Sequence, residues 1–295
     1  CGVVSQEASA DDPVYLEQGW DHQTRQQLSF TSFGSRFIPY DWFLVLEQPD
    51  SSISFRDNNH MAALGFVTTT ADEYNPDGLP VGLVRDADKK NGDYLGLTCA
   101  ACHTGQVRIN GKRIRIDGGQ ALIDYTQFEQ KVLAALKATL GDSDKFLRFS
   151  APLIAADKTL TEDAVATQVQ TRIEELEKHY AVNASEVAYG HGRLDAFGQI
   201  FNAIAVEALN LPENTHAPDA PTSYPVLWDA SHLNVVQWNA SAPNKEPGPL
   251  FQNAITALAV YGTVIVPKNK PTYQSSIRIN NLGEIQKDFY QLVAP

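Results

Sequence analysis

The chain has 295 residues, 43% of them hydrophobic and 20% charged, and a formal net charge of -12. This composition is typical of an ordinary globular protein, and the lack of a basic surplus argues against a nucleic-acid partner, because binding to phosphates depends on clustered Lys and Arg side chains. An acidic balance is compatible with docking on a basic redox partner, although in most proteins it serves solubility. No run of about 18 apolar residues is present, so the pattern predicts no membrane-spanning helix.

The N-terminal segment, residues 1–30, is polar and has no clear hydrophobic period. We therefore expect an arm or linker that lies on the surface, followed by a single domain over residues 31–295. The first residue, Cys1, has no predicted disulfide partner. A mature chain that begins with cysteine is typical of a bacterial lipoprotein, in which this cysteine carries a lipid anchor. The alternative is an unpaired thiol at an arbitrary chain boundary.

The periodic stretches that follow are mostly helical. Apolar residues recur every three or four positions, and the stretches end at glycine or proline, as amphipathic helices do. The predicted helices cover residues 37–48, 58–65, 124–140, 161–180 and 195–209, with two more between 250 and 295. Turn-forming residues at 75–80 and a long stretch rich in Pro and Trp at 213–249 are predicted to be ordered loops.

One strand signal is clear. Asn110 and Gly111, a pair that favours a type I′ turn, lie between two runs of alternating apolar residues, which predicts a β-hairpin at about 107–116. The alternation places Val107, Ile109, Ile114 and Ile116 on one face and the arginines largely on the other. Together these patterns predict a mainly α fold with one small hairpin.

A short motif carries the strongest chemical signal. Cys99 and Cys102 are separated by two alanines, and His103 follows directly. Two thiols at this spacing can add across the vinyl groups of a porphyrin, and the adjacent histidine reaches the iron as the proximal ligand. A structural zinc site would need about four ligands, and a thioredoxin-like motif would follow a strand of a βαβ unit; the sequence supplies neither. The motif therefore predicts one covalent haem c.

The sixth coordination position of the iron decides what such a haem does. A strong sixth ligand favours electron transfer, whereas an open position admits peroxide or oxygen. The candidate ligands are Met61, His191 and His232. Met61 lies in an apolar helical stretch, where filling the core is the alternative interpretation. His191 and His232 lie in stretches that contain glycine or tryptophan, and a histidine there more often has another role.

Several strings beyond the motif resemble one family. They are NPDGLPVG at 75–82, LGLTCAACHTG at 95–105, IDGG at 116–119, GHGRLDAF at 190–197, SYPVLWD at 223–229 and VQWN at 236–239. In this order they are similar to the bacterial di-haem cytochrome c peroxidase-like superfamily, and most to its rubber-oxygenase branch. The resemblance covers about residues 55–245.

The resemblance implies a c-type cytochrome fold with long helical and loop insertions, and a periplasmic or cell-surface location. It also implies that the segment 224–244 walls the distal side of the haem. The residues expected nearest the iron are Leu227, Trp228, Trp238 and Ala242. Arg193 is a candidate partner for a haem propionate, which suits the geometry of a guanidinium; the alternative is an ion pair with Asp195.

One departure from the family changes what is expected. Its members carry a second Cys-x-x-Cys-His motif, which this sequence lacks. The chain is then a fragment, or works with a second haem domain or subunit, or carries one haem by nature. We expect a peroxidase- or oxygenase-like oxidoreductase that also transfers electrons to or from a redox partner protein. The alternative is a purely electron-transfer cytochrome subunit with a six-coordinate haem.

Overall fold

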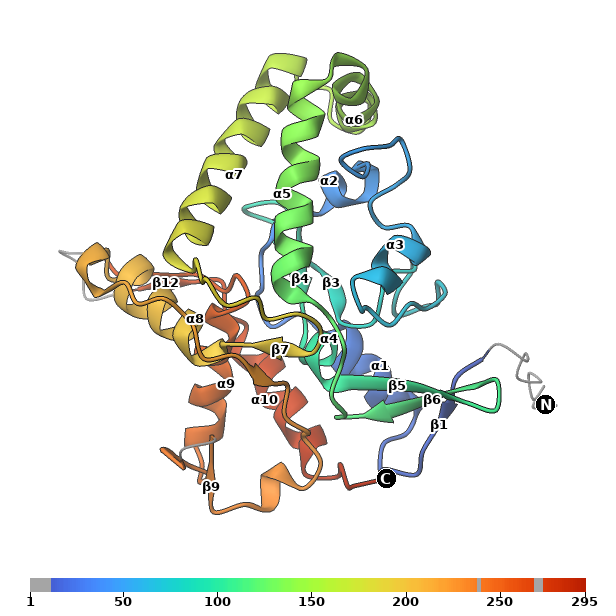
Figure 1. Ribbon diagram of the computed structural model, residues 1–295, viewed down its shortest axis with the longest axis vertical. Helices are drawn as coiled ribbons and strands as arrows, with labels where there is room; N and C mark the ends of the chain where they lie inside the picture. The colour runs from blue at the N-terminus through green and yellow to red at the C-terminus, as the bar shows by residue number, and fades with distance from the viewer. Residues whose placement is uncertain (1–11, 238–239, 268–272) are drawn as a thin grey trace.

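The computed structural model describes residues 12–237, 240–267 and 273–295, in which ten α-helices accompany twelve short strands in five small sheets (Figure 1). The predicted fold class, a mainly α c-type cytochrome fold with one hairpin, is therefore wrong, because the described chain is a mixed α/β structure. Most of the strands have two to four residues. A stretch so short shows no alternation in the sequence, and it forms only because main-chain groups of distant segments pair.

Three long helices form one end of the molecule, where α5 (Tyr125–Gly141) packs against α6 (Ser143–Ala156) and α7 (Glu162–Val182) (Figure 1). The predicted helices at 124–140 and 161–180 are confirmed. The side chains of Asp124 and Thr161 accept hydrogen bonds from the first turns of α5 and α7, which satisfies amides that the helices leave free. The sequence pattern does not predict α6, because Pro152, a residue that usually ends a helix, lies inside it.

The shorter predicted helices are also present. They are α2 (Tyr40–Val45), α3 (Asn58–Ala63), α8 (Ala196–Asn202), which continues as a π-helical turn at Ala203–Ala208, α9 (Gly248–Leu258) and α10 (Ile279–Phe289). α2 is shorter than expected because the preceding residues pair as a strand. Among the described residues, no helix is both long and apolar enough to cross a bilayer.

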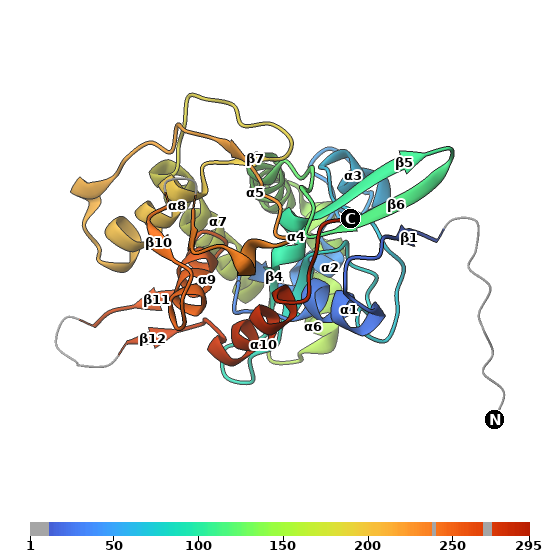
Figure 2. The same cartoon turned by 90° about the horizontal axis from the view of Figure 1, so that it is seen from below.

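The described part of the N-terminal segment is not the surface arm that its polar sequence predicts. β1 (Val14–Tyr15) pairs in parallel with β6, and α1 (His22–Phe30) follows it. α1 packs against α10, and Figure 2 shows the two helices running on the same side of the molecule. Trp20 and Leu28 are 4% and 2% exposed. A few large apolar side chains at irregular spacing anchor the segment without producing a periodic pattern.

The motif lies in the chain between strands of two three-stranded sheets. β2 (Ile38–Pro39), β4 (Tyr94–Leu97) and β3 (Leu83–Asp86) form one sheet in the order β2-β4-β3. β1, β6 (Lys112–Asp117) and β5 (Thr104–Ile109) form the other, in the order β1-β6-β5. The helix α4 (Cys99–His103) lies between β4 and β5 in the chain. Both ends of the motif are therefore fixed by sheet hydrogen bonds.

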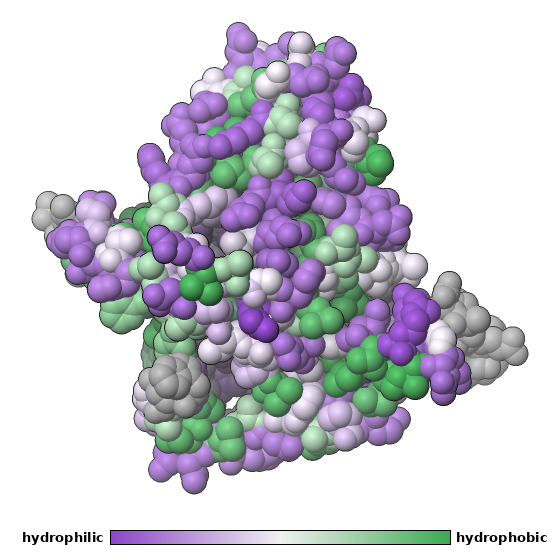
Figure 3. All heavy atoms as spheres, in the orientation of Figure 1, coloured by the Kyte–Doolittle hydropathy of each residue, from purple (hydrophilic) through white to green (hydrophobic). Residues whose placement is uncertain are grey.

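The hairpin of β5 and β6 confirms the predicted turn. Asn110 and Gly111 have φ of 50° and 80°, as a type I′ turn requires. Val107 pairs with Ile114, as the alternation predicts. The apolar face is nevertheless the more exposed one at the tip, where Val107 and Ile109 are 42% and 52% exposed. Figure 3 shows hydrophobic residues gathered over this hairpin.

The remaining strands are small pairs in the C-terminal half. β7 (Arg193–Leu194) pairs with β8 (Thr222–Ser223), β9 (Val235–Val236) with β10 (Ala242–Pro243), and β11 (Val264–Ile265) with β12 (Gln274–Ser275). Together with single 3-10 turns at Pro212–Asn214 and Ala230–His232 they give order to the described part of the stretch 213–249. The predicted ordered loop at 75–80 is also confirmed, since the buried side chain of Asn75 bonds to both main-chain groups of Leu79.

Aromatic rings form the centre of the main core. The ring of Phe128 on α5 lies 5.4 Å from that of Phe37, 6.2 Å from that of Phe55 and 5.0 Å from that of Phe66. Phe128 is fully buried, and tilted or edge-on pairs at these separations contribute beyond their buried area. This core connects α5 to the segments that precede the motif.

Candidate functional site

The helix α4 places the motif between the main core and the C-terminal helices. Ala100 and Ala101 are buried, whereas Cys99, Cys102 and His103 are partly exposed. The main chain of Gly82 lies against this turn: its φ is +89°, and a Cβ there would be 2.2 Å from the nitrogen of Ala101. Only glycine permits this approach, so the small residues at 82, 100 and 101 hold the turn against the β3 segment.

His103 is held by a residue far away in the chain. Its Nδ1 lies 2.8 Å from the carbonyl oxygen of Pro225, which can only accept a hydrogen bond, so Nδ1 carries the proton and Nε2 keeps its lone pair. Burial lowers the pKa of His103 to about 4, although the hydrogen bond to Pro225 opposes this. The imidazole is thus neutral near pH 7 and presents Nε2, the state and atom that a metal requires.

The two cysteines are free thiols one helical turn apart. Burial raises the pKa of Cys99 to about 11 and that of Cys102 to about 12. Tyr224 belongs to the core cluster against which Cys102 packs, and its hydroxyl lies 3.4 Å from the carbonyl oxygen of Ile123. A thioredoxin-type cysteine needs a lowered pKa, because the thiolate is the nucleophile. The buried environment of Cys99 and Cys102 instead raises the pKa of both thiols, which disfavours the thiolate.

The surroundings also distinguish the motif from a structural metal cage. Within the described ranges, no three or more His, Cys, Asp or Glu side chains lie together in a way that could hold a metal ion. A porphyrin supplies four nitrogen ligands itself, so the iron requires only axial ligands from the protein. The motif offers two thiols and one neutral histidine with a free Nε2, and apolar side chains surround it. This set of groups fits a covalently bound haem.

The apolar wall comes from both ends of the chain. Cys99 contacts a cluster built around Trp20, Leu28 and Ile285, and Leu227 and Trp228 pack against the same cluster. The structure therefore brings two of the predicted distal-pocket residues to the motif. The segment that contains them also includes Pro225, whose carbonyl oxygen accepts the hydrogen bond from His103. The other two candidates differ in position: Ala242 lies in β10, paired with Val236, and Trp238 lies outside the described residues.

The candidate sixth ligands lie in different places. Met61 is fully buried in the main core on α3, which matches the core-filling alternative. His191 is exposed, and its Nδ1 lies 2.8 Å from the carbonyl oxygen of Leu122. His232 is exposed in a 3-10 turn.

Arg193 is exposed in β7, opposite Ser223. Its alternative partner, Asp195, instead caps α8: the carboxylate accepts hydrogen bonds from the amides of Gly198 and Ala220. In the part of the chain that the structure describes, no ion pair joins Arg193 to Asp195. The role of Arg193 toward a haem propionate stays a prediction. Cys1, the predicted lipid attachment point, lies outside the described residues.

Sequence reasoning missed several residues around the motif. Pro225 acts through its main-chain carbonyl, which no side-chain pattern reveals, and Tyr224 reaches Cys102 only through the tertiary fold. A buried carboxyl group, Glu129, lies on α5 among three tyrosines. Its only sequence signal is a polar residue at a position of α5 that the apolar period assigns to the core.

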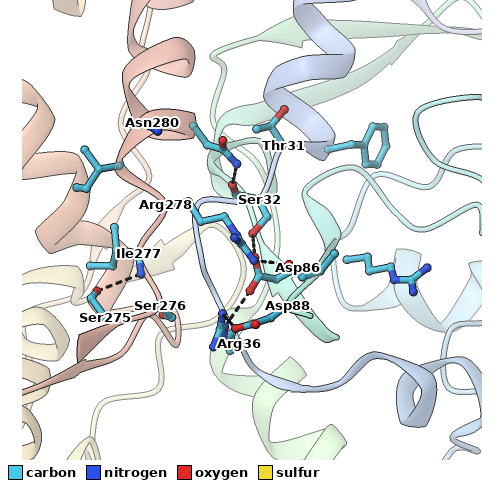
Figure 4. A pocket seen from close by; sticks show the side chains of 15 residues that line it. Thr31, Ser32, Arg36, Asp86, Asp88, Ser275, Ser276, Ile277, Arg278 and Asn280 are labelled. Carbon is cyan, nitrogen blue, oxygen red and sulfur yellow. Dashed lines mark hydrogen bonds and ion pairs between the residues drawn. The ribbon is translucent and has the colours of Figure 1, made fainter. Parts of the chain in front are cut away.

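A polar cleft of about 820 Å³ lies apart from the motif, between the end of α1, β3 and the start of α10 (Figure 4). The carboxylate of Asp86, which is fully buried, forms ion pairs with Arg36 at 2.8 Å and Arg278 at 2.5 Å and accepts a hydrogen bond from Ser32 at 2.7 Å. Because these charges compensate one another, the cleft is a clamp that fixes the C-terminal segment to β3.

Comparisons with known proteins give one similar sequence. The chain is 31% identical to the uncharacterized protein y4iJ of Sinorhizobium fredii (strain NBRC 101917 / NGR234) over 306 residues, which cover 94% of this chain and 50% of that protein. The chain thus spans about half the length of the curated relative that it matches. No family model matches the sequence. No solved structure matches it.

Proposed function

We propose that this chain is a c-type haem protein with redox activity, a peroxidase- or oxygenase-like oxidoreductase that also transfers electrons. The observation that carries the proposal is the state of His103 beside two free thiols: the carbonyl of Pro225 fixes the proton on Nδ1, and Nε2 is available to the iron. The resemblance of the strings around the motif to the di-haem cytochrome c peroxidase-like superfamily supports the same proposal.

The residues of the chain have distinct parts in this proposal. Cys99 and Cys102 would form the two thioether bonds, and His103 would bind the iron as the proximal ligand. The bound haem would supply one-electron redox chemistry. Pro225 orients His103 and raises its basicity as a ligand. Trp20, Leu227 and Trp228 exclude water around Cys99, and a poorly solvated environment influences the reduction potential of a haem.

The proposal includes a location and partners. Covalent haem c implies a periplasmic or cell-surface protein, with a redox partner protein that supplies or accepts electrons. The matched relative is about twice as long as the aligned region, which is consistent with a second domain that accompanies this one. The acidic net charge of -12 suits a basic face on the redox partner.

Haem attachment is tested by expression in a bacterial host that matures c-type cytochromes. The denatured protein is examined by its pyridine haemochrome spectrum and by intact mass. We expect one covalent haem in the wild type and in a Cys1→Ser control, and none in a Cys99→Ser, Cys102→Ser double variant. A wild type without covalent haem, or a double variant that retains it, would overturn the proposal.

The choice between catalysis and electron transfer alone is tested on the same purified protein. An optical and EPR spectrum shows whether the ferric haem is high-spin, with an open position, or low-spin and six-coordinate. We expect a high-spin component that changes on addition of peroxide, and a ferrous form that binds carbon monoxide. A low-spin haem that responds to neither would favour the electron-transfer subunit with a six-coordinate haem.

A further inference from the structure

A buried carboxyl group lies among tyrosines between α5 and α7. Glu129 is 4% exposed. The hydroxyl of Tyr261 donates a hydrogen bond of 2.5 Å to Glu129 Oε1, and the hydroxyl of Tyr180 lies 3.4 Å from that of Tyr261. Tyr125, one helical turn before Glu129, is buried as well, and its hydroxyl lies 3.4 Å from the carbonyl oxygen of Ala259. Among the described residues, no lysine or arginine forms an ion pair with Glu129.

The protonation of Glu129 follows from these neighbours. Burial raises its pKa to about 7, while the charge of His179 and the hydrogen bond of Tyr261 act in the opposite direction. The ionisable groups that interact with its charge come from its own helix, from α7, from the segment before β7, from the turn after α9 and from the segment after β8: Tyr125, His179, Tyr180, Tyr189, Tyr261 and Tyr224. Arg172 on α7 and Glu207 in the π-helical turn act on His179.

The cluster connects to both the motif and the solvent. Toward the motif, Cys102 packs against the main core, and Tyr125 and Tyr224 belong to that core. Toward the solvent, the ring of His179 lies 5.0 Å from that of Tyr261, and His179 Nδ1 lies 2.8 Å from the exposed carboxylate of Glu207. Polar side chains therefore run from the edge of the haem-attachment turn to the surface.

We propose that Glu129 is a proton-exchange site coupled to the redox state of the haem attached at Cys99 and Cys102. The inference rests on the proposed function. Reduction of a bound haem by a one-electron donor protein would add one negative charge at the motif, and Glu129, whose tyrosine neighbours lie in the core against which Cys102 packs, would take up one proton from solvent. When the electron leaves, Glu129 would release this proton to solvent on the side of His179 and Glu207.

The test is the reduction potential of the haem-loaded protein, measured by optical redox titration between pH 5 and pH 9. In the wild type we expect the potential to fall with rising pH around neutrality, with a slope that approaches about 59 mV per tenfold change in proton concentration for full coupling. In Glu129→Gln, which keeps the shape but cannot ionise, this slope disappears. The control Glu174→Gln, an exposed residue of α7, leaves the slope unchanged.

A second variant tests the direction of the effect. Tyr261→Phe removes a hydrogen bond that favours the ionised form of Glu129, so the pH range of the slope moves upward. An infrared difference spectrum between the oxidised and reduced protein shows a carboxylic acid band that Glu129→Gln lacks. The infrared measurement does not need Tyr261→Phe, so the proposal can still be tested if that variant folds poorly.

The outcomes separate this inference from the proposed function. Without covalent haem, both are overturned. With covalent haem, a wild-type potential that is independent of pH in this range, or a slope and infrared band that Glu129→Gln leaves in place, overturns the role of Glu129 alone.

Discussion

Replacing Glu129 changes how the stability of the protein depends on pH, even without haem. A glutamate ordinarily has a pKa of 4.5, and burial raises that of Glu129 to about 7. Because one pKa unit corresponds to about 1.4 kcal/mol, the folded state disfavours the ionised carboxylate by roughly 3 kcal/mol. Below pH 4.5 both the folded and the unfolded chain hold the proton, and this cost is absent. As pH rises to 7, the unfolded chain releases its proton first, and stability falls.

Glu129→Gln removes this pH dependence. Urea unfolding followed by circular dichroism gives the free energy of unfolding at several pH values between 4.5 and 8, and the difference between variant and wild type cancels the titration of other groups. We expect this difference to move in favour of the variant by roughly 3 kcal/mol across the range. For Glu174→Gln it should stay constant. If wild type and Glu129→Gln give parallel curves, Glu129 ionises in the folded protein as freely as in water, and the reasoning is refuted.

Three further substitutions test the packing of the turn at the motif, of the Asp86 clamp and of the aromatic core. Gly82→Ala places a methyl group against the main chain of Ala101, and we expect this variant to contain less covalent haem than the wild type. The pyridine haemochrome spectrum measures the haem content, and an unchanged content would contradict the close approach of Gly82 to Ala101. Asp86→Ala leaves Arg278 without its partner and should destabilise the protein by about 3 kcal/mol in urea unfolding; a loss below about 1 kcal/mol would show that the clamp contributes little. Phe128→Ala should cost about 3 to 5 kcal/mol in the same assay, and a smaller loss would mean that the aromatic core collapses around the cavity.

The sequence predicts those parts of the fold that have a local cause. α5 and α7 carry an apolar period and a capping side chain, and the hairpin depends on Asn110 and Gly111 at its turn. The strands β2 to β4 and β7 to β12 escape prediction because each is short and forms only when a distant partner is present. The fold class is wrong for the same reason.

In the candidate site, too, the features with a local cause are predicted from the sequence and the long-range contacts are not. The spacing of Cys99, Cys102 and His103 is a local property, and the structure places these residues on one turn of helix. The contacts that set their chemistry are not local, since Pro225 reaches His103 across 122 positions of sequence. Glu129 is a polar residue on a core face, and such a departure from the apolar period is the signal that marks a buried ionisable group before a structure is known.

The carbonyl of Pro225 has a consequence for the order of assembly. A free histidine exchanges its proton between both ring nitrogens, and only the folded segment from Tyr224 to Trp228 selects one of them. The proposed thioether bonds would depend on residues that are neighbours in the chain, whereas the choice of nitrogen at His103 requires a segment that is synthesised more than one hundred residues later. Under the proposed function, the motif alone would therefore suffice to attach a porphyrin, whereas a His103 with its proton fixed on Nδ1 requires the folded segment that contains Pro225.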